Sequence, residues 1–225
     1  NRLFWIGAFY LAALPSTVSS SVVMVSIARG NVPSAIFNTS ISSLLGVFIT
    51  PVWMGIILSS KGANYDITSV VLKLALQVLL PVVLGILLHP KFGAFAERNK
   101  VSLKVFDQSI ILLIVYTSFC ESFANRMFAG HSIAEIFILG MAMIALFLLI
   151  YGIITLVSRL LHFSTEDHIT AVFCGSKKSL VHGTVMSKVL FPGISGVGVI
   201  LLPLMIFHAL QLIAASIIAQ KFDRR

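Results

Sequence analysis

The chain has 225 residues, of which 58% are hydrophobic and only 11% are charged. Soluble globular domains carry about 25% charged residues, so this composition excludes an ordinary soluble domain and indicates a membrane protein. Sixteen basic and eight acidic residues give a net charge of +8, but the basic residues lie between apolar stretches, as loop residues of membrane proteins do. The charge therefore indicates the lipid bilayer as a partner, not nucleic acid. The two cysteines and six histidines show no metal-ligand spacing, so we expect neither a metal centre of the usual kinds nor an organic cofactor.

Seven apolar segments follow one another, each near the roughly 20 residues that a helix needs to cross a bilayer. They are residues 3–28, 34–59, 68–89, 103–124, 133–161, 168–192 and 194–219. Backbone groups in lipid must be satisfied within the segment, and these segments are too long for barrel strands. The sequence therefore predicts an all-α, polytopic membrane protein. Turn sequences such as His89-Pro90-Lys91 are expected to separate the segments.

Loop charges predict the orientation of the segments. If the N-terminus lies outside, the inner side receives Arg29, Lys91, Arg98, Lys100, Lys104, Arg159, Lys221, Arg224 and Arg225. The outer side then receives only Arg2, Lys61 and Arg126. Because cytoplasmic loops carry the excess of Lys and Arg, we expect the C-terminus to be cytoplasmic.

The first segment is interrupted by Pro15 and a run of hydroxyl side chains that ends at Ser21. Proline removes a backbone donor and disrupts the preceding turn, and the hydroxyls can bind exposed backbone or a ligand. The next segment continues the polar pattern. The candidate substrate- and ion-binding residues here are Ser19, Ser20, Ser21, Asn38, Thr39 and Ser42. The alternative for each hydroxyl is that it only allows close helix packing.

The sixth segment carries two adjacent lysines between apolar stretches. Each lysine costs about 2.5–3.5 kcal/mol at a helix centre, so such residues usually face a cavity or a partner. The alternative is that they snorkel to the interface. The candidate binding residues of this segment are Gly175, Ser176, Lys177, Lys178, Ser179 and His182. For His182 a structural role is the alternative to a titrating one.

The two interrupted segments correspond to one another, because a further apolar helix follows each after a Pro- and Gly-containing turn. This arrangement is typical of inverted-repeat transporters, whose binding site lies at the membrane midplane between discontinuous helices. An intramembrane hydrolase with a Ser176–Lys177 dyad is a third possibility. Neighbouring residues point about 100° apart on a helix, which argues against such a dyad and against an enzyme.

Two strings resemble a known family: Ala28-Arg29-Gly30-Asn31-Val32, and Cys174-Gly175-Ser176-Lys177-Lys178-Ser179-Leu180. They are similar to the fourth-to-fifth and ninth helices of the bile acid:sodium symporter superfamily, in its SBF-like branch. The resemblance implies ten helices in two inverted repeats, with the fourth and ninth helices discontinuous and crossing. This chain would hold helices four to ten, with three helices before it. Residues 1–59 and 126–225 would form parts of a core domain and residues 60–125 part of a panel domain, in a bacterial inner membrane.

The resemblance also implies a sodium site, with Ser21 and Thr39 as ligands. The chain departs from the family pattern at Val22, Ala35, Phe173 and Lys177. These positions carry oxygen-bearing side chains in the family, and hard cations prefer oxygen ligands. The departures argue against sodium coupling, and we expect the Lys177 ammonium to stand where sodium would bind.

Two functions remain open at this stage. The first is a secondary active, symporter-like transporter of a small organic anion, with the two lysines as fixed cations near the crossing. The second is a non-transporting regulatory membrane protein that retains the transporter fold, which the departures from the sodium-site pattern favour. No feature of the sequence indicates an oligomeric state.

Overall fold

The computed structural model describes residues 2–59, 67–124, 126, 132–192 and 196–223, and the regular structure within them is α-helical. The helices are α1 (Arg2–Ala13), α2 (Ser19–Ile27), α3 (Val32–Ser59), α4 (Ile67–Arg98), α5 (Lys100–Ala124), α6 (Ile133–Leu160), α7 (Thr165–Gly175), α8 (Leu180–Leu190) and α9 (Val197–Asp223). Three stretches, Val32–Ile57 of α3, all of α6 and all of α9, are long and apolar enough to cross a membrane. The chain is therefore a helical integral membrane protein.

The expected segments correspond to these helices in different ways. Segments 34–59, 133–161 and 194–219 coincide with the three spanning helices. Segment 3–28 is divided into α1 and α2, and segment 168–192 is divided into α7 and α8.

The expected turn at Pro90 is wrong. Helix α4 continues through Pro81 and Pro90 to Arg98, and only Asn99 separates it from α5. A proline removes one backbone hydrogen bond, and the helices of membrane proteins tolerate this loss where the freed carbonyl finds another partner. The expected loop at residues 60–66 lies outside the described residues.

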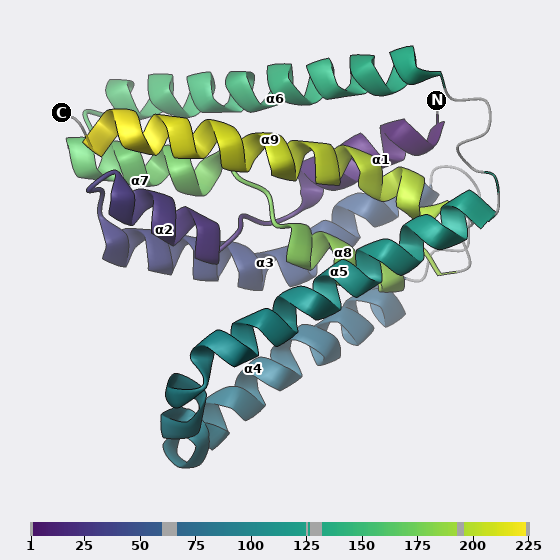
Figure 1. Ribbon diagram of the computed structural model, residues 1–225, viewed down its shortest axis with the longest axis horizontal. Coiled ribbons are helices and arrows are strands. Elements are labelled where there is room, and N and C mark those ends of the chain that lie inside the picture. Colours follow the sequence, from purple (N-terminus) through teal and green to yellow (C-terminus); the bar gives the residue numbers. More distant parts are fainter. Residues whose placement is uncertain (1, 60–66, 125, 127–131, 193–195, 224–225) are drawn as a thin grey trace.

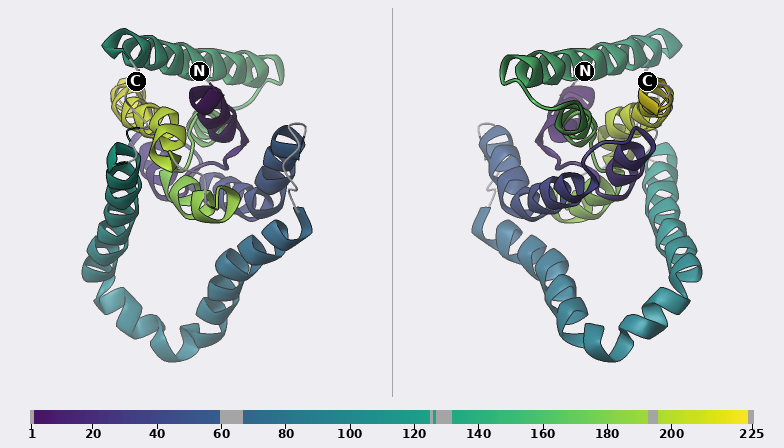
Figure 2. Two further views of the ribbon diagram at one scale, coloured as in Figure 1. Left: turned by 90° about the vertical axis from the view of Figure 1, so that its right-hand side faces the viewer. Right: turned by 90° about the vertical axis from the view of Figure 1, so that its left-hand side faces the viewer.

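Helices from the two ends of the chain pack against one another (Figure 1). Helix α1 packs on α9, while α2 and α3 pack on α7. Helix α6 covers α7 and α9 on one side. Helices α4 and α5 diverge from their junction like the arms of a V and extend away from the other helices (Figure 2).

The main hydrophobic core lies where α1, α8 and α9 meet. Tyr10 of α1 and Phe191, at the end of α8, are buried and pack edge to face, with ring centroids 5.2 Å apart. Gly7 allows α1 to approach α9 closely, since an added Cβ would collide with the carbonyl oxygen of Ile200. By contrast, large apolar side chains are exposed along α3, α4, α5 and α6. A helix that is apolar on its outer face as well as its inner face is suited to lipid.

Candidate substrate and ion site

The two interruptions of the helices meet inside the molecule. Residues 14–18 link α1 to α2, and residues 176–179 link α7 to α8. They touch directly, because the Ser179 amide donates a hydrogen bond to the Pro15 carbonyl at 3.0 Å. The C-terminal ends of α1 and α7 and the N-terminal ends of α2 and α8 therefore converge. The C-terminal ends present partly negative carbonyls and the N-terminal ends present partly positive amides.

Lys178 closes the C-terminal end of α1. Its Nζ donates to the carbonyls of Ala12 and Leu14, each at 2.8 Å. The last carbonyls of a helix have no partner within the helix, and a cation at that end is also favoured by the helix dipole. Lys178 thus satisfies two exposed backbone acceptors with one ammonium group.

The other carbonyls at this helix end are also satisfied by protein groups. The hydroxyl of Thr50, on α3, donates to the Ala13 carbonyl at 2.7 Å. The Ser179 amide binds the Pro15 carbonyl. Each of the four carbonyls of residues 12–15 therefore has a donor from elsewhere in the fold.

Gln211 of α9 holds the backbone of Lys178 in place. The Lys178 amide donates to Gln211 Oε1 at 2.7 Å, and Gln211 Nε2 donates to the Lys178 carbonyl at 2.8 Å. Gln211 is fully buried, and its Nε2 also lies 2.8 Å from His208 Nδ1. Because the N–H and the C=O of one residue are both bound by one rigid amide, the position of the Lys178 backbone is closely defined. Sequence analysis missed Gln211 and Thr50, although a lone amide within the apolar α9 segment is a detectable signal.

Lys177 occupies a more enclosed position beside α2. Its side chain is 1% exposed, and its Nζ donates to the Ser20 carbonyl at 2.8 Å. The same nitrogen lies 5.6 Å from the centre of the Phe173 ring, where the electron-rich face of the ring attracts a cation. An ammonium group has three donors, and one carbonyl contact is found for this one.

Neither lysine is paired with a carboxylate among the described side chains. The ion pairs found in the described part of the chain lie at exposed positions instead, namely Arg29 with Asp223 and Lys100 with Glu97. The buried Lys177 ammonium and the half-buried Lys178 ammonium consequently have backbone carbonyls and one aromatic ring as their partners.

Hydroxyl groups connect α7 to the first interruption. Ser16 Oγ donates to the Cys174 carbonyl at 2.5 Å, and Ser21 Oγ donates to the Phe173 carbonyl at 3.2 Å. Both serines are buried. Carbonyls in the last turn of α7, which lack a partner within the helix, are thus bound by hydroxyls of the α1–α2 link and of α2.

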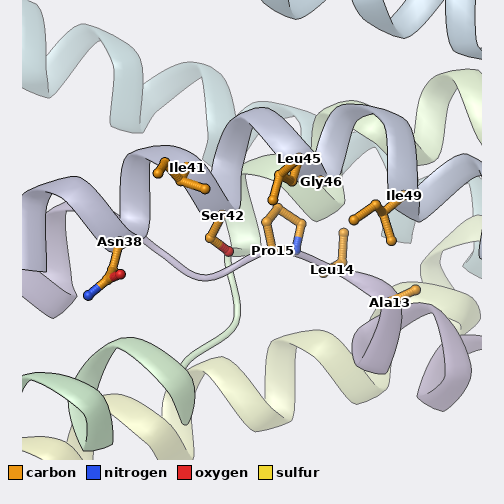
Figure 3. A pocket seen from close by; sticks show the side chains of 9 residues that line it. All are labelled: Ala13, Leu14, Pro15, Asn38, Ile41, Ser42, Leu45, Gly46 and Ile49. Carbon is orange, nitrogen blue, oxygen red and sulfur yellow. The ribbon is translucent and has the colours of Figure 1, made fainter.

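The predicted residues of α3 take different positions. Thr39 is fully buried, and its hydroxyl donates to the Ala35 carbonyl at 2.7 Å within the same helix. Ser42 Oγ accepts a hydrogen bond from the Ser16 amide at 3.0 Å, which ties α3 to the first interruption. Asn38 is exposed and lies on the same side of α3 as Ser42 (Figure 3).

The remaining predicted residues lie at the helix ends. Ser19 is exposed and Ser20 is half-buried at the start of α2. Gly175 is exposed at the end of α7, and Ser176 is buried with its hydroxyl bound to the Val172 carbonyl at 2.7 Å. Ser179 caps α8, and its Oγ accepts from the His182 amide at 3.2 Å and lies 2.8 Å from His182 Nδ1.

A cavity of about 380 Å³ adjoins the first interruption (Figure 3). Its volume is within the range of small-molecule sites, and its lining is mostly apolar, as is usual for them. Asn38 and Ser42 contribute its polar side chains. The lining residues are Ala13, Leu14, Pro15, Asn38, Ile41, Ser42, Leu45, Gly46 and Ile49.

Comparison with known proteins places this arrangement in a family. The model of the SBF-like CPA transporter family matches residues 1–224. The chain belongs to the SBF-like CPA transporter family. This match confirms the resemblance seen in the sequence. The chain belongs to a transporter family and is not an enzyme.

Proteins similar to this chain occur in bacteria and vertebrates. The chain is 43% identical to "Uncharacterized protein PA2026" of Pseudomonas aeruginosa, over 98% of this chain and 66% of the relative. It is 39% identical to "Putative symporter YfeH" of Escherichia coli K12, over 100% of this chain and 67% of that protein. It is 31% identical to "Sodium/bile acid cotransporter 7" of Rattus norvegicus, over 92% of this chain and 61% of that protein. The chain therefore spans about two thirds of the length of these relatives.

Proposed function

We propose that this protein is a secondary active, symporter-like transporter that moves a small organic anion across the cytoplasmic membrane. The observation that carries the proposal is a pair of adjacent lysines, the buried Lys177 and the half-buried Lys178, where the α1–α2 and α7–α8 links meet, which we call the crossing. Neither lysine has a carboxylate partner among the described side chains. Ionisable residues inside a membrane mark substrate and ion pathways.

The charge of the site supports an anion as the substrate. Each buried lysine costs about 2.5–3.5 kcal/mol at the centre of a membrane helix. Backbone carbonyls at the C-terminal end of α1 and in the first turn of α2 offset part of this cost through hydrogen bonds. Carbonyl dipoles carry no net charge, so a carboxylate or sulfonate that arrives beside the lysines supplies the missing counter-charge.

The pairing of helix sets supports an inverted-repeat mechanism. Helices α1, α2 and α3 have 12, 9 and 28 residues, and α7, α8 and α9 have 11, 11 and 27. We propose that these sets are the two repeats, with α1–α2 and α7–α8 as crossing discontinuous helices. Rocking of one part of the protein against the other would then expose the crossing to each side of the membrane in turn.

The V formed by α4 and α5 supports the proposed division into domains. These helices correspond to residues 60–125, the part assigned to the panel domain, and they extend away from the rest of the molecule (Figure 2). Residues 1–59 and 126–225 would then form parts of the core domain that contains the crossing. Substrate would bind where the panel and the crossing face each other, in contact with Ser19 and Ser20 at the start of α2 and close to the enclosed Lys177 ammonium.

A second candidate, a non-transporting regulatory protein, is favoured by the hydrogen bonding of the crossing. The carbonyls of residues 12–15 and the hydroxyls of Ser16, Ser21 and Thr39 are all engaged within the protein. Such a site needs no ion to complete it, which suits a protein that keeps the fold without transporting.

A transport assay separates the two functions. The full protein is reconstituted in proteoliposomes and uptake of labelled taurocholate, ethanesulfonate and benzenesulfonate is measured. A transporter gives saturable uptake of at least one anion, which Lys177→Gln lowers at least tenfold. Lys188→Gln, at an exposed lysine of α8, is the matched control and should leave uptake unchanged. Absence of saturable uptake by folded protein would support the regulatory alternative and reject transport of these anions.

A further inference from the structure

The crossing already contains the positive charge that a coupling ion would bring. Lys178 Nζ donates hydrogen bonds to the carbonyls of Ala12 and Leu14, and Lys177 Nζ donates one to the carbonyl of Ser20. Exposed carbonyls at the ends of half-helices are the groups that coordinate sodium or protons in transporters with discontinuous helices. At the C-terminal end of α1 the Lys178 ammonium takes this place, whereas Lys177 binds a carbonyl in the first turn of α2.

The candidate sodium ligands do not fit a sodium ion. The hydroxyls of Ser21 and Thr39 each donate to a carbonyl, at 3.2 Å to Phe173 and at 2.7 Å to Ala35. These donated protons leave the oxygen lone pairs of both hydroxyls available, so the misfit lies in the number of oxygens and in the positive charge beside them. A hard cation needs several oxygens converging at once, by analogy with other cations of this kind. A cation beside Ser21 would also approach the charged Lys177, which binds the neighbouring Ser20, and like charges repel strongly at low dielectric.

We propose that Lys177 and Lys178 replace a mobile coupling cation, so that the substrate anion crosses the membrane without a co-transported ion and its movement carries net charge. This inference rests on the anion transport of the proposed function and replaces its symport step with uniport driven by the membrane potential. The positive charges remain in the protein throughout, since they belong to side chains and not to a solute. Only the charge of the anion therefore crosses with each substrate.

The membrane potential then sets the direction of net transport. Moving one charge through 100 mV is worth about 2.3 kcal/mol, which corresponds to a concentration ratio of about 50, since about 1.4 kcal/mol is tenfold. An inside-negative potential drives an unaccompanied anion outward. The protein would act as an exporter of monoanions, or an importer only down a steep gradient.

Electrical measurements on proteoliposomes test the inference. A potential is imposed with valinomycin and a potassium gradient, and taurocholate, ethanesulfonate and benzenesulfonate are the substrates because sulfonates stay ionised and carry no proton. The expected result is a distribution ratio that changes about 50-fold per 100 mV and is unaffected by sodium or by a pH gradient. Electroneutral flux, a sodium requirement or distribution that follows the proton gradient would overturn the inference while leaving anion transport intact. No saturable flux of any of these anions would overturn the proposed function and the inference with it.

A measurement without substrate tests the sodium site separately. Thermal unfolding of the purified full protein is followed in sodium chloride and in choline chloride at equal ionic strength. The melting temperatures should agree for the unmutated protein and for the Lys188→Gln control. Stabilisation of the unmutated protein by sodium would show a sodium site. It would reject the proposal that the two lysines replace a coupling cation, whether or not a transported anion has been found.

Discussion

The amide of Gln211 connects the link between α7 and α8 to α9, and its replacement gives a direct measure of what this clamp contributes. Gln211→Leu keeps a side chain of similar size but removes both the acceptor for the Lys178 amide and the donor to the Lys178 carbonyl, at 2.7 and 2.8 Å. Gln211 is fully buried, so water does not readily replace it. We therefore expect both backbone groups of Lys178 to lose their partners.

The size of the effect follows from these two groups. Each buried polar group left without a partner costs about 1–3 kcal/mol, so the substitution should destabilise the protein by about 2–6 kcal/mol. For a chain of this length 1 kcal/mol shifts the melting temperature by about 2–4 °C. Gln211→Leu should therefore lower it by about 4–24 °C. Transport should fall as well, because Lys178 would no longer be held against the end of α1.

Gln220→Leu provides the matched control. Gln220 lies on the same helix but is exposed, and surface substitutions usually change stability by less than about 0.5 kcal/mol. The assay is thermal unfolding of the purified protein in detergent, followed by fluorescence and by size-exclusion chromatography. If the two variants melt within 1 °C of each other, the amide clamp does not hold the crossing and the reasoning is wrong.

Two further predictions concern packing and orientation. Gly7→Ala should destabilise the protein by about 1–3 kcal/mol, because the added Cβ collides with the backbone at Ile200. Gly152→Ala is the control and should not destabilise the protein, because its Cβ meets nothing within 4 Å. Equal melting temperatures of the two variants would contradict the close approach of α1 and α9. Single cysteines at Lys100 and Arg126, in a protein without its two native cysteines, should react with an impermeant reagent from opposite sides of the membrane, Lys100 from the inside and Arg126 from the outside. Labelling of both from the same side would contradict the predicted topology, and labelling with the two sides exchanged would reverse the predicted orientation.

Much of the helical pattern could be predicted from local sequence. Pro15 and the serines after it, like the lysine pair between glycines at residues 175 and 183, interrupt long apolar segments. These are effects of composition within one turn or two, so they can be recognised without tertiary contacts. The same local rule failed at Pro90, where α4 continues to Arg98. One lost hydrogen bond does not end a helix if its flanks are strongly helical.

The candidate site was predictable in its residues but not in its bonds. Lysines and hydroxyl residues within apolar segments can be recognised from the sequence as candidate site residues, because burying them costs free energy unless they find a partner. Which partner each one takes depends on segments far apart in the chain. Lys178 binds the end of α1 across 164 and 166 residues, and Ser21 binds the end of α7 across 152.

The sequence by itself determined that this protein is a helical membrane protein with two interrupted segments and two lysines in need of partners. Only the tertiary structure decided that Lys178 binds backbone carbonyls at the end of α1 and Lys177 one in the first turn of α2, with Gln211 fixing the backbone of Lys178. The physical reason is that apolar periodicity and helix breakers act along the chain. Which groups bind the free backbone carbonyls at an interrupted helix end depends on the side chains that the fold brings to that end.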